Sequence, residues 1–180
     1  MRERPMTADI AIRPARPDDM AGLETLYPAA FPDEDLLGLV RALSAEGPTV
    51  VSLVAERDGR VIGHVCVSIC GVGGRPNAAG LLGPLAVAPE AQGQGLGRAL
   101  VETGLERMAD AGVDAVCVLG DPGYYGRYGF EPGTGIAPPY PMPEEWREAW
   151  QGLRTSPDAP RVSGRLEPPA PWMDEALWRP

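Results

Sequence analysis

The chain contains no lysine, one histidine and only three cysteines among its 180 residues, and its formal net charge is -9. All 16 basic side chains are therefore arginines. Nucleic acids and anionic membranes are bound through clustered positive charge, which this composition does not favour. We therefore expect neither a nucleic-acid nor a membrane partner. The acidic surface either aids solubility or suits a cationic substrate.

Scarce cysteine also restricts the class of protein. Cys66, Cys70 and Cys117 lie in apolar runs, which favours buried thiols in a reducing cytoplasm over a disulfide framework. No cluster with the spacing of metal ligands accompanies them, so no metal is expected. The first six residues lack the apolar segment of a signal peptide, and no apolar run approaches the ~20 residues that cross a bilayer. The sequence predicts a cytoplasmic protein.

Apolar periodicity predicts one mixed sheet with a few helices. Strands are expected at residues 9–13, 49–56, 61–72, 81–88 and 114–119, helices at 20–27, 36–43 and 95–111, and a glycine-rich loop at 71–80. The succession of a strand, a helix and a strand over residues 81–119 implies two parallel neighbours. The predicted fold class is therefore α/β (α+β), with a mixed, mostly antiparallel central sheet flanked by helices.

The last third of the chain differs in composition. Residues 133–180 are rich in proline and contain all four tryptophans, Trp146, Trp150, Trp172 and Trp178. Large aromatic side chains are seldom left in solvent, so this extension is expected to pack on a core of residues 9–132. A small helix at 144–150 and a strand at 161–167 are expected within it.

A glycine turn between a strand and a helix is the most informative stretch. Gly93, Gly95 and Gly97 follow the strand at 81–88 and begin the helix at 95–111. The start of a helix offers unpaired N–H groups and the positive end of its dipole, which together bind phosphate groups. The stretch therefore predicts a phosphate-containing ligand.

The identity of that ligand depends on the residues around the glycines. A Walker P-loop requires lysine and then Ser or Thr, but Arg98 and Ala99 occupy those positions. A Rossmann fingerprint requires a third glycine where Arg98 stands. Both nucleotide-binding motifs are thereby disfavoured. From the glycines alone, a plain strand-to-helix turn remains an alternative.

The wider stretch resembles the acyl-CoA motif of the GNAT superfamily of N-acetyltransferases. That motif is a hydrophobic strand, Val-x-Pro and then Gln/Arg-x-x-Gly-x-Gly/Ala, which residues 85–100 match through Gln92, Gly95 and Gly97. Residues 125–132 are similar to the family's Tyr-x-x-x-Gly-Phe element, and residues 59–65 to its central hairpin. The resemblance implies a GNAT-like acyl-CoA N-acyltransferase fold and direct acetyl transfer from acetyl-CoA to an amine of a small molecule or protein. A monomer or homodimer is expected.

The resemblance also implies the binding residues. Backbone amides at residues 92–98 would hold the pyrophosphate, and the strand at 85–87 would contact the pantetheine arm. Pro84 and Pro89 bound this strand and leave backbone groups free, which fits a locally opened sheet. The expected acetyl-CoA site comprises Leu85, Ala86, Val87, Gln92, Gly93, Gln94, Gly95, Leu96, Gly97 and Arg98.

The resemblance makes Tyr125 the expected general acid for the departing CoA thiolate, with Tyr124 as the alternative. The acceptor amine must lose a proton before it attacks, and Glu56, His64 or water could take it.

By analogy with the family, the acceptor is expected beside Phe31 and the acids at 33–35. These acids would either contact a cationic amine or stabilise the N-terminus of a helix. A non-catalytic acyl-CoA-binding or sensor domain of the same fold is the alternative function.

Overall fold

The structure is a computed structural model and describes residues 10–180; the predicted start of the first strand at Asp9 and the segment Met1–Met6 lie outside the described residues. One nine-stranded sheet dominates it, and seven of the strands follow the order β1-β2-β3-β4-β5-β8-β6. These strands are β1 (Ile10–Pro14), β2 (Val50–Arg57), β3 (Arg60–Val72), β4 (Arg75–Val87), β5 (Ala115–Leu119), β6 (Glu131–Pro132) and β8 (Trp150–Arg154). In addition, β9 (Gly164–Glu167) pairs with β3 and with β7 (Ile136–Ala137).

Most of these pairings are antiparallel. Among the described strands, the parallel pairs are β4 with β5 and β7 with β9. The helix between β4 and β5 makes the crossover that the sequence predicted. The predicted mixed, mostly antiparallel sheet flanked by helices is confirmed.

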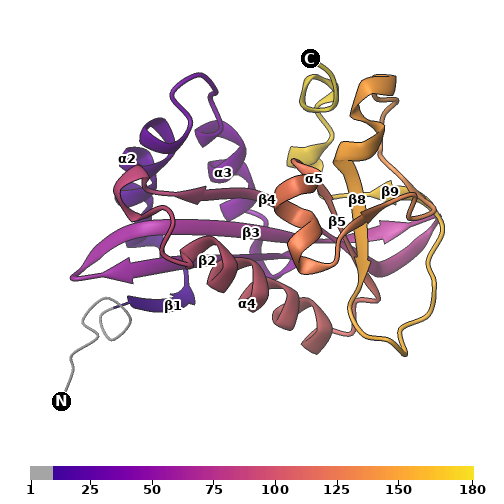
Figure 1. Ribbon diagram of the computed structural model, residues 1–180, viewed down its shortest axis with the longest axis horizontal. Helices are drawn as coiled ribbons and strands as arrows, with labels where there is room; N and C mark the ends of the chain where they lie inside the picture. Colours follow the sequence, from indigo (N-terminus) through magenta and orange to yellow (C-terminus); the bar gives the residue numbers. More distant parts are fainter. Residues whose placement is uncertain (1–9) are drawn as a thin grey trace.

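The helices cover both faces of the sheet. They are α2 (Met20–Ala30), α3 (Leu37–Ser44), α4 (Leu96–Asp110) and the short α5 (Pro122–Tyr125). In β3, His64 bonds Tyr27 of α2, whereas a Cβ at Gly63 would touch Leu100 of α4. Successive strand residues point to opposite faces, so α2 and α4 lie on opposite sides of the sheet (Figure 1). None of the helices within residues 10–180 is long and apolar enough to cross a membrane.

Close packing of α4 explains its apolar stripe. Leu100, Val101 and Met108 are fully buried, as the helical periodicity predicted. A Cβ at Gly104 would lie 3.0 Å from a methyl group of Val67, so the glycine lets the helix approach the sheet. This contact holds the middle of α4 close to β3.

The predicted glycine-rich loop at 71–80 is wrong. Gly73 and Gly74 alone form the turn, because Val72 already pairs with Arg75. A two-residue hairpin turn needs positive φ values, which two glycines supply. The small residues that follow continue β4, and Ala79 and Gly80 pair with both β3 and β5.

The C-terminal segment contributes to the sheet itself. The expected helix at 144–150 is a 3-10 helix over Glu144–Ala149, and the chain then forms β8, which no pattern predicted. This strand pairs antiparallel with β5 and separates β5 from β6. The proposed boundary at residue 132 thus falls between two strands of one sheet, and the division into core and extension stays a prediction.

A charged network secures the first strand. The guanidinium of Arg13 bonds both carboxylate oxygens of Asp19 at 2.8 and 2.9 Å, and it also bonds Glu56 at 2.8 Å. The backbone N–H of Arg16 donates to Asp19 as well, at 2.6 Å. The bond from Arg13 is the main reason that the pKa of Asp19 lies below its usual value. This nearly buried carboxylate therefore joins β1 to the start of α2.

We expect Asp19→Asn to lower the free energy of unfolding at pH 7 by about 1–3 kcal/mol, the usual cost of breaking a buried charged hydrogen bond. A lowered pKa contributes stability that is fully present above the unfolded-state pKa of ~3.9 and is lost as pH falls through the lower pKa of the folded state. The variant should therefore lose less stability than wild type in strong acid. Urea titrations of wild type and variant at pH 7 and in strong acid, below the folded-state pKa of Asp19, test this. Glu24→Gln is the matched control, because its ion pair with Arg41 is exposed. An equal loss in both variants would contradict the prediction.

Candidate active site

The parallel strands β4 and β5 separate in the middle of the molecule. Their pairing runs from Ala79 to Leu82 of β4, and beyond Leu82 β4 pairs only with β3. At this point Gly83 and Pro84 both oppose the single residue Cys66, which makes a β-bulge. We call Gly83 and Pro84 the β4 break. Beyond the break, the edge of β4 that faced β5 has no strand partner among the described residues.

The start of α4 lies beside this free edge. Gly95 is the N-cap, with φ of 84°, and it supplies no side-chain bond to the first turn. The amides of Leu96, Gly97 and Arg98 are among the helix N–H groups that have no intrahelical acceptor. The side-chain amide of Gln92 donates to the carbonyl of Val87 at 3.2 Å and so ties the turn to the end of β4.

A cleft of about 480 Å³ joins the two features. Most of the predicted acetyl-CoA residues line it: Leu85, Val87, Gln92, Gly93, Gly95, Leu96, Gly97 and Arg98. The rest of the lining consists of Ala30, Phe31, Ala91, Tyr124, Arg127 and Tyr128. Two predicted residues lie outside the lining. Ala86 pairs with His64 and is buried, and Gln94 bonds the carbonyl of Glu90.

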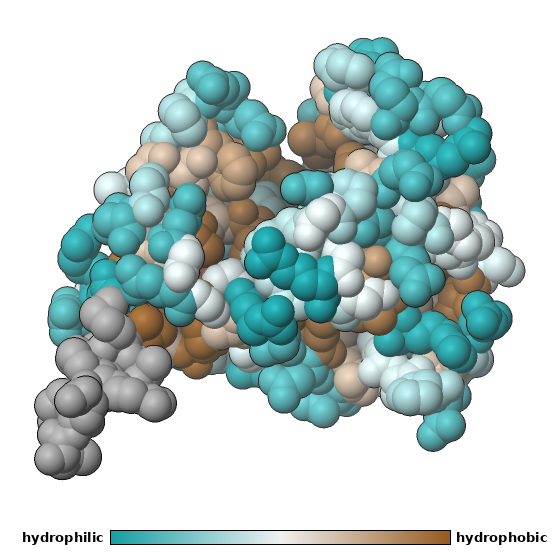
Figure 2. Space-filling model, viewed as in Figure 1, coloured by the Kyte–Doolittle hydropathy of each residue, from teal (hydrophilic) through white to brown (hydrophobic). Residues whose placement is uncertain are grey.

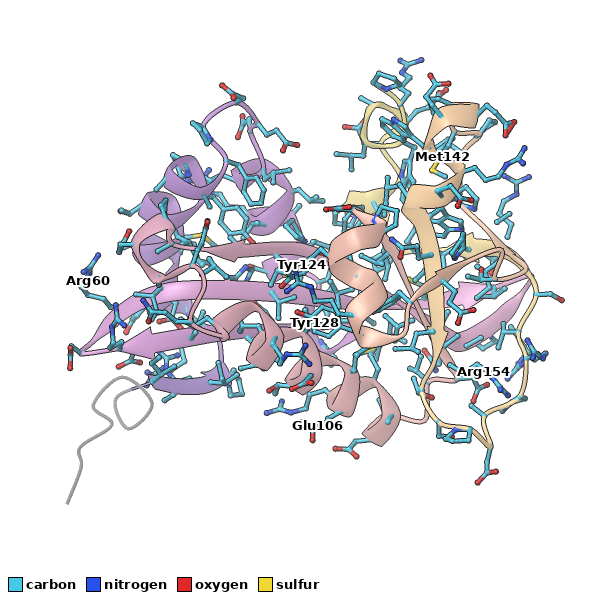
Figure 3. The ribbon with its side chains drawn as sticks, viewed as in Figure 1. Arg60, Glu106, Tyr124, Tyr128, Met142 and Arg154 are labelled. Carbon is cyan, nitrogen blue, oxygen red and sulfur yellow. The ribbon has the colours of Figure 1, made fainter. Side chains whose placement is uncertain are left out.

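The two neighbouring tyrosines occupy different environments. Tyr124 lines the cleft, and its hydroxyl lies so close to Gly97 that a Cβ there would collide with it. Tyr128 donates a hydrogen bond to that hydroxyl at 3.0 Å; Tyr124 belongs to α5 and Tyr128 to the 3-10 turn that follows it (Figure 3). Tyr125 instead packs edge-on against Phe130, with ring centroids 5.9 Å apart, and its burial raises its pKa. It is not part of the cleft lining.

Two arginines give the cleft positive charge. Arg98 pairs with Glu102 at 3.1 Å and lies over the Tyr128 ring. Arg127 lies 4.8 Å from the centre of the Tyr124 ring, and no carboxylate in the described chain pairs with it. An arginine that no carboxylate neutralises can bind an anionic group of a ligand. The sequence analysis did not select Arg127, although it lies within the Tyr-x-x-x-Gly-Phe element.

Neither candidate base faces the cleft. Glu56 is held by Arg13 and lies 3.8 Å from Arg16, so its charge is already neutralised. His64 is completely buried. Its Nδ1 is 2.7 Å from the Tyr27 hydroxyl and its Nε2 is 2.8 Å from the Ser52 hydroxyl. Burial lowers the pKa of His64 to about 4.

The loop between α2 and α3 borders the cleft through Phe31, which stacks on Tyr27. The acids at 33–35 are exposed, and none lies in the first turn of α3. The expectation that they stabilise this helix start is therefore wrong. Within residues 10–180, no group of three or more His, Cys, Asp or Glu side chains could hold a metal ion.

The fold and the cleft define an acyltransferase of the GNAT class. The sequence profile of the acetyltransferase (GNAT) family matches residues 18–130, more than half of the chain. The chain therefore belongs to this family, and the family and the acyltransferase class predicted from the sequence are confirmed.

Individual relatives agree with this assignment. YjhQ of Escherichia coli K12, described as an uncharacterized N-acetyltransferase, is 40% identical over an alignment of 114 residues that covers 59% of this chain and 63% of YjhQ. YhbS of the same strain, described in the same way, is 40% identical over 121 residues, or 67% of this chain and 72% of YhbS. The chain thus matches less than two thirds of the length of YjhQ.

Solved structures extend the similarity to most of the chain. E. coli YhbS in complex with CoA superposes with a TM-score of 0.82 at 34% identity, covering 92% of this chain and 93% of that one. A GNAT acetyltransferase from Brucella melitensis in complex with acetyl-CoA has a TM-score of 0.73 at 33% identity, covering 91% and 97%.

The buried histidine makes stability depend on pH. His64 has an ordinary pKa of 6.5 in the unfolded chain and about 4 in the folded one, so the unfolded state binds the proton first as pH falls. We expect wild type to lose about 2 kcal/mol of unfolding free energy between pH 7 and pH 5. Urea titrations of wild type and His64→Gln measure this loss. The variant should be nearly insensitive to pH in that range, and parallel curves would contradict the assignment.

Proposed function

We propose that this protein transfers the acetyl group of acetyl-CoA directly to a primary amine of a small molecule or protein. The observation that carries the proposal is the cleft itself, which combines an unpaired strand edge with an uncapped helix start. The unpaired edge of β4 can pair with the amides of a pantetheine arm, and the start of α4 can bind a pyrophosphate. Relatives solved with CoA and with acetyl-CoA support the choice of cosubstrate.

The proposed placement follows from the two features. The pyrophosphate binds the first amides of α4, between Gly95 and Arg98, where the helix dipole also favours it. Arg127 adds a charge-assisted bond to a phosphate oxygen. The pantetheine arm runs along Leu85 and Val87 and pairs with the free edge of β4 as a further strand would. The thioester then lies at the β4 break.

The proposed reaction is a single acyl transfer. The lone pair of the amine attacks the thioester carbonyl carbon, the C–S bond breaks, and the thiolate takes a proton from a tyrosine hydroxyl. The motif assigns this proton to Tyr125, while the cleft lining favours Tyr124. The bond that Tyr124 accepts from Tyr128 leaves its own O–H free to donate. We propose water as the acceptor of the amine proton, because Glu56 is ion-paired and His64 is buried.

The absence of Glu56 and His64 from the cleft lining also favours a second candidate function. A domain that binds acyl-CoA without turnover needs the cleft but no base. Acetyl-CoA binding together with no thiol release in a screen of primary amines would support this second function.

We further propose that the protein works in a reducing compartment such as the cytoplasm. Cys66, Cys70 and Cys117 are all free and buried. Burial raises the pKa of Cys66 and of Cys117 to about 12, so both remain protonated thiols. Such thiols pack as small apolar groups and form no disulfide, as is usual for proteins of a reducing compartment.

Acetyl-CoA should stabilise the folded chain. At a concentration 100-fold above its dissociation constant, the expected gain in unfolding free energy is about 2.7 kcal/mol, seen as a higher melting temperature.

Arg127→Gln should weaken acetyl-CoA binding about tenfold through the lost charged hydrogen bond. Isothermal titration calorimetry gives the affinities. Arg147→Gln, whose ion pair with Glu144 lies outside the cleft, is the matched control. A wild-type chain that shows no binding heat and no higher melting temperature with acetyl-CoA would refute the proposal.

Separate phenylalanine substitutions identify the proton donor. The variant that removes the donor should lose about 100-fold in kcat, a usual size for general acid catalysis, with little change in acetyl-CoA affinity. Tyr124→Phe and Tyr125→Phe differ from wild type by one hydroxyl each, so each controls for the other. Steady-state thiol release measures kcat. Unchanged kcat in both variants would exclude a tyrosine donor.

A further inference from the structure

A tryptophan from the far end of the chain covers the β4 break. A Cβ built on Gly83 would lie 3.6 Å from the six-membered ring of Trp172. The indole N–H of Trp172 donates to the hydroxyl of Ser68 on β3 at 3.1 Å. Ser68 is completely buried, so this bond fixes the ring over the break.

Two further tryptophans hold Trp172 in place. Trp178 donates its indole N–H to the carbonyl of Trp172 at 2.9 Å, and the two ring centroids lie 6.0 Å apart. Trp178 in turn packs edge-on against Trp150 at 5.6 Å. Trp150 begins β8, which pairs with β5. A continuous row of aromatic rings therefore links the β5 side of the sheet to the β4 break.

Trp172 and the cleft-lining side chain of Leu85 lie on opposite faces of the sheet. Ser68 and His64 are four residues apart in β3, so both point to the face that α2 covers. Leu85 pairs with Val65, whose side chain points to the face of α4. Residues 170–172 also contact α3. A hollow with hydrophobic surface at its base separates the α2–α3 lobe from the C-terminal lobe (Figure 2).

We propose that Trp172 closes the acceptor side of the thioester site, where it excludes water and limits the size of the amine that reaches the carbonyl. This inference rests on the proposed function, because only that function places a thioester at the β4 break. The cosubstrate occupies the α4 face and the amine approaches from the α2 face. The ring of Trp172 lies against the break on that second face, where its indole N–H bonds Ser68.

The reaction that the Trp172 ring would prevent is hydrolysis of the thioester. A water oxygen can attack the thioester carbonyl carbon in place of the amine. The C–S bond then breaks, acetate forms, and the thiolate of CoA takes up a proton. A site that excludes water suppresses this hydrolysis.

The test measures thiol release from acetyl-CoA with no amine present. Trp172→Ala removes the ring that covers Gly83 and should raise this hydrolysis about tenfold. Trp172→Phe keeps a flat ring over Gly83 and should stay near wild type, even though it loses the bond to Ser68. Trp146→Ala is the matched control, because it removes a tryptophan of the same C-terminal segment, whereas the ring beside Gly83 is that of Trp172. Calorimetry with acetyl-CoA accompanies each variant.

Each result decides the matter. Faster hydrolysis in Trp172→Ala alone, with acetyl-CoA affinity retained, supports the proposal. Unchanged hydrolysis in a Trp172→Ala chain that still binds acetyl-CoA overturns it, as does an equal rise in Trp146→Ala. Should Trp172→Ala fail to fold, Trp172→Leu provides the same measurement with a smaller wall. A wild-type chain that does not bind acetyl-CoA would refute the proposed function instead.

Discussion

The separation of β4 from β5 after Leu82 is the constraint on which the rest of the site depends. Two residues of β4 face a single residue of β3 at this point, and the strand loses its parallel neighbour. A sheet edge with unpaired N–H and C=O groups is costly unless another group pairs with it. Here the edge forms one wall of a cleft, the start of α4 forms another, and a tryptophan covers the opposite face. We infer that acetyl-CoA supplies the missing partner.

Much of this arrangement could be predicted from the sequence because it is local. The glycine turn before Leu96 and the apolar stripe of α4 follow from residues that are close in the chain. Gln92 and the Tyr-x-x-x-Gly-Phe element make the predicted ligand more specific, because they indicate coenzyme A rather than any phosphate compound. These signals work because a helix start and a tight turn are determined by the few residues that form them.

The remaining features depend on contacts between distant residues. β8 has no clear alternation, and it becomes a strand because β5 offers it an edge. The proximity of Trp172 to Gly83 joins positions almost ninety residues apart in the printed sequence. The difference between Tyr124 and Tyr125 depends on which ring points to Gly97 and which to Phe130. Periodicity within one short turn cannot distinguish these directions.

Amide hydrogen exchange with and without acetyl-CoA tests the central claim most directly. If the cosubstrate completes the sheet, added acetyl-CoA will slow exchange at residues 85–87 and at the first amides of α4. A second cavity of about 570 Å³, lined by Thr134, Arg154 and Arg161 among others, provides an internal comparison and should not respond. Protection that appears there, with none along β4 and the start of α4, would contradict the account.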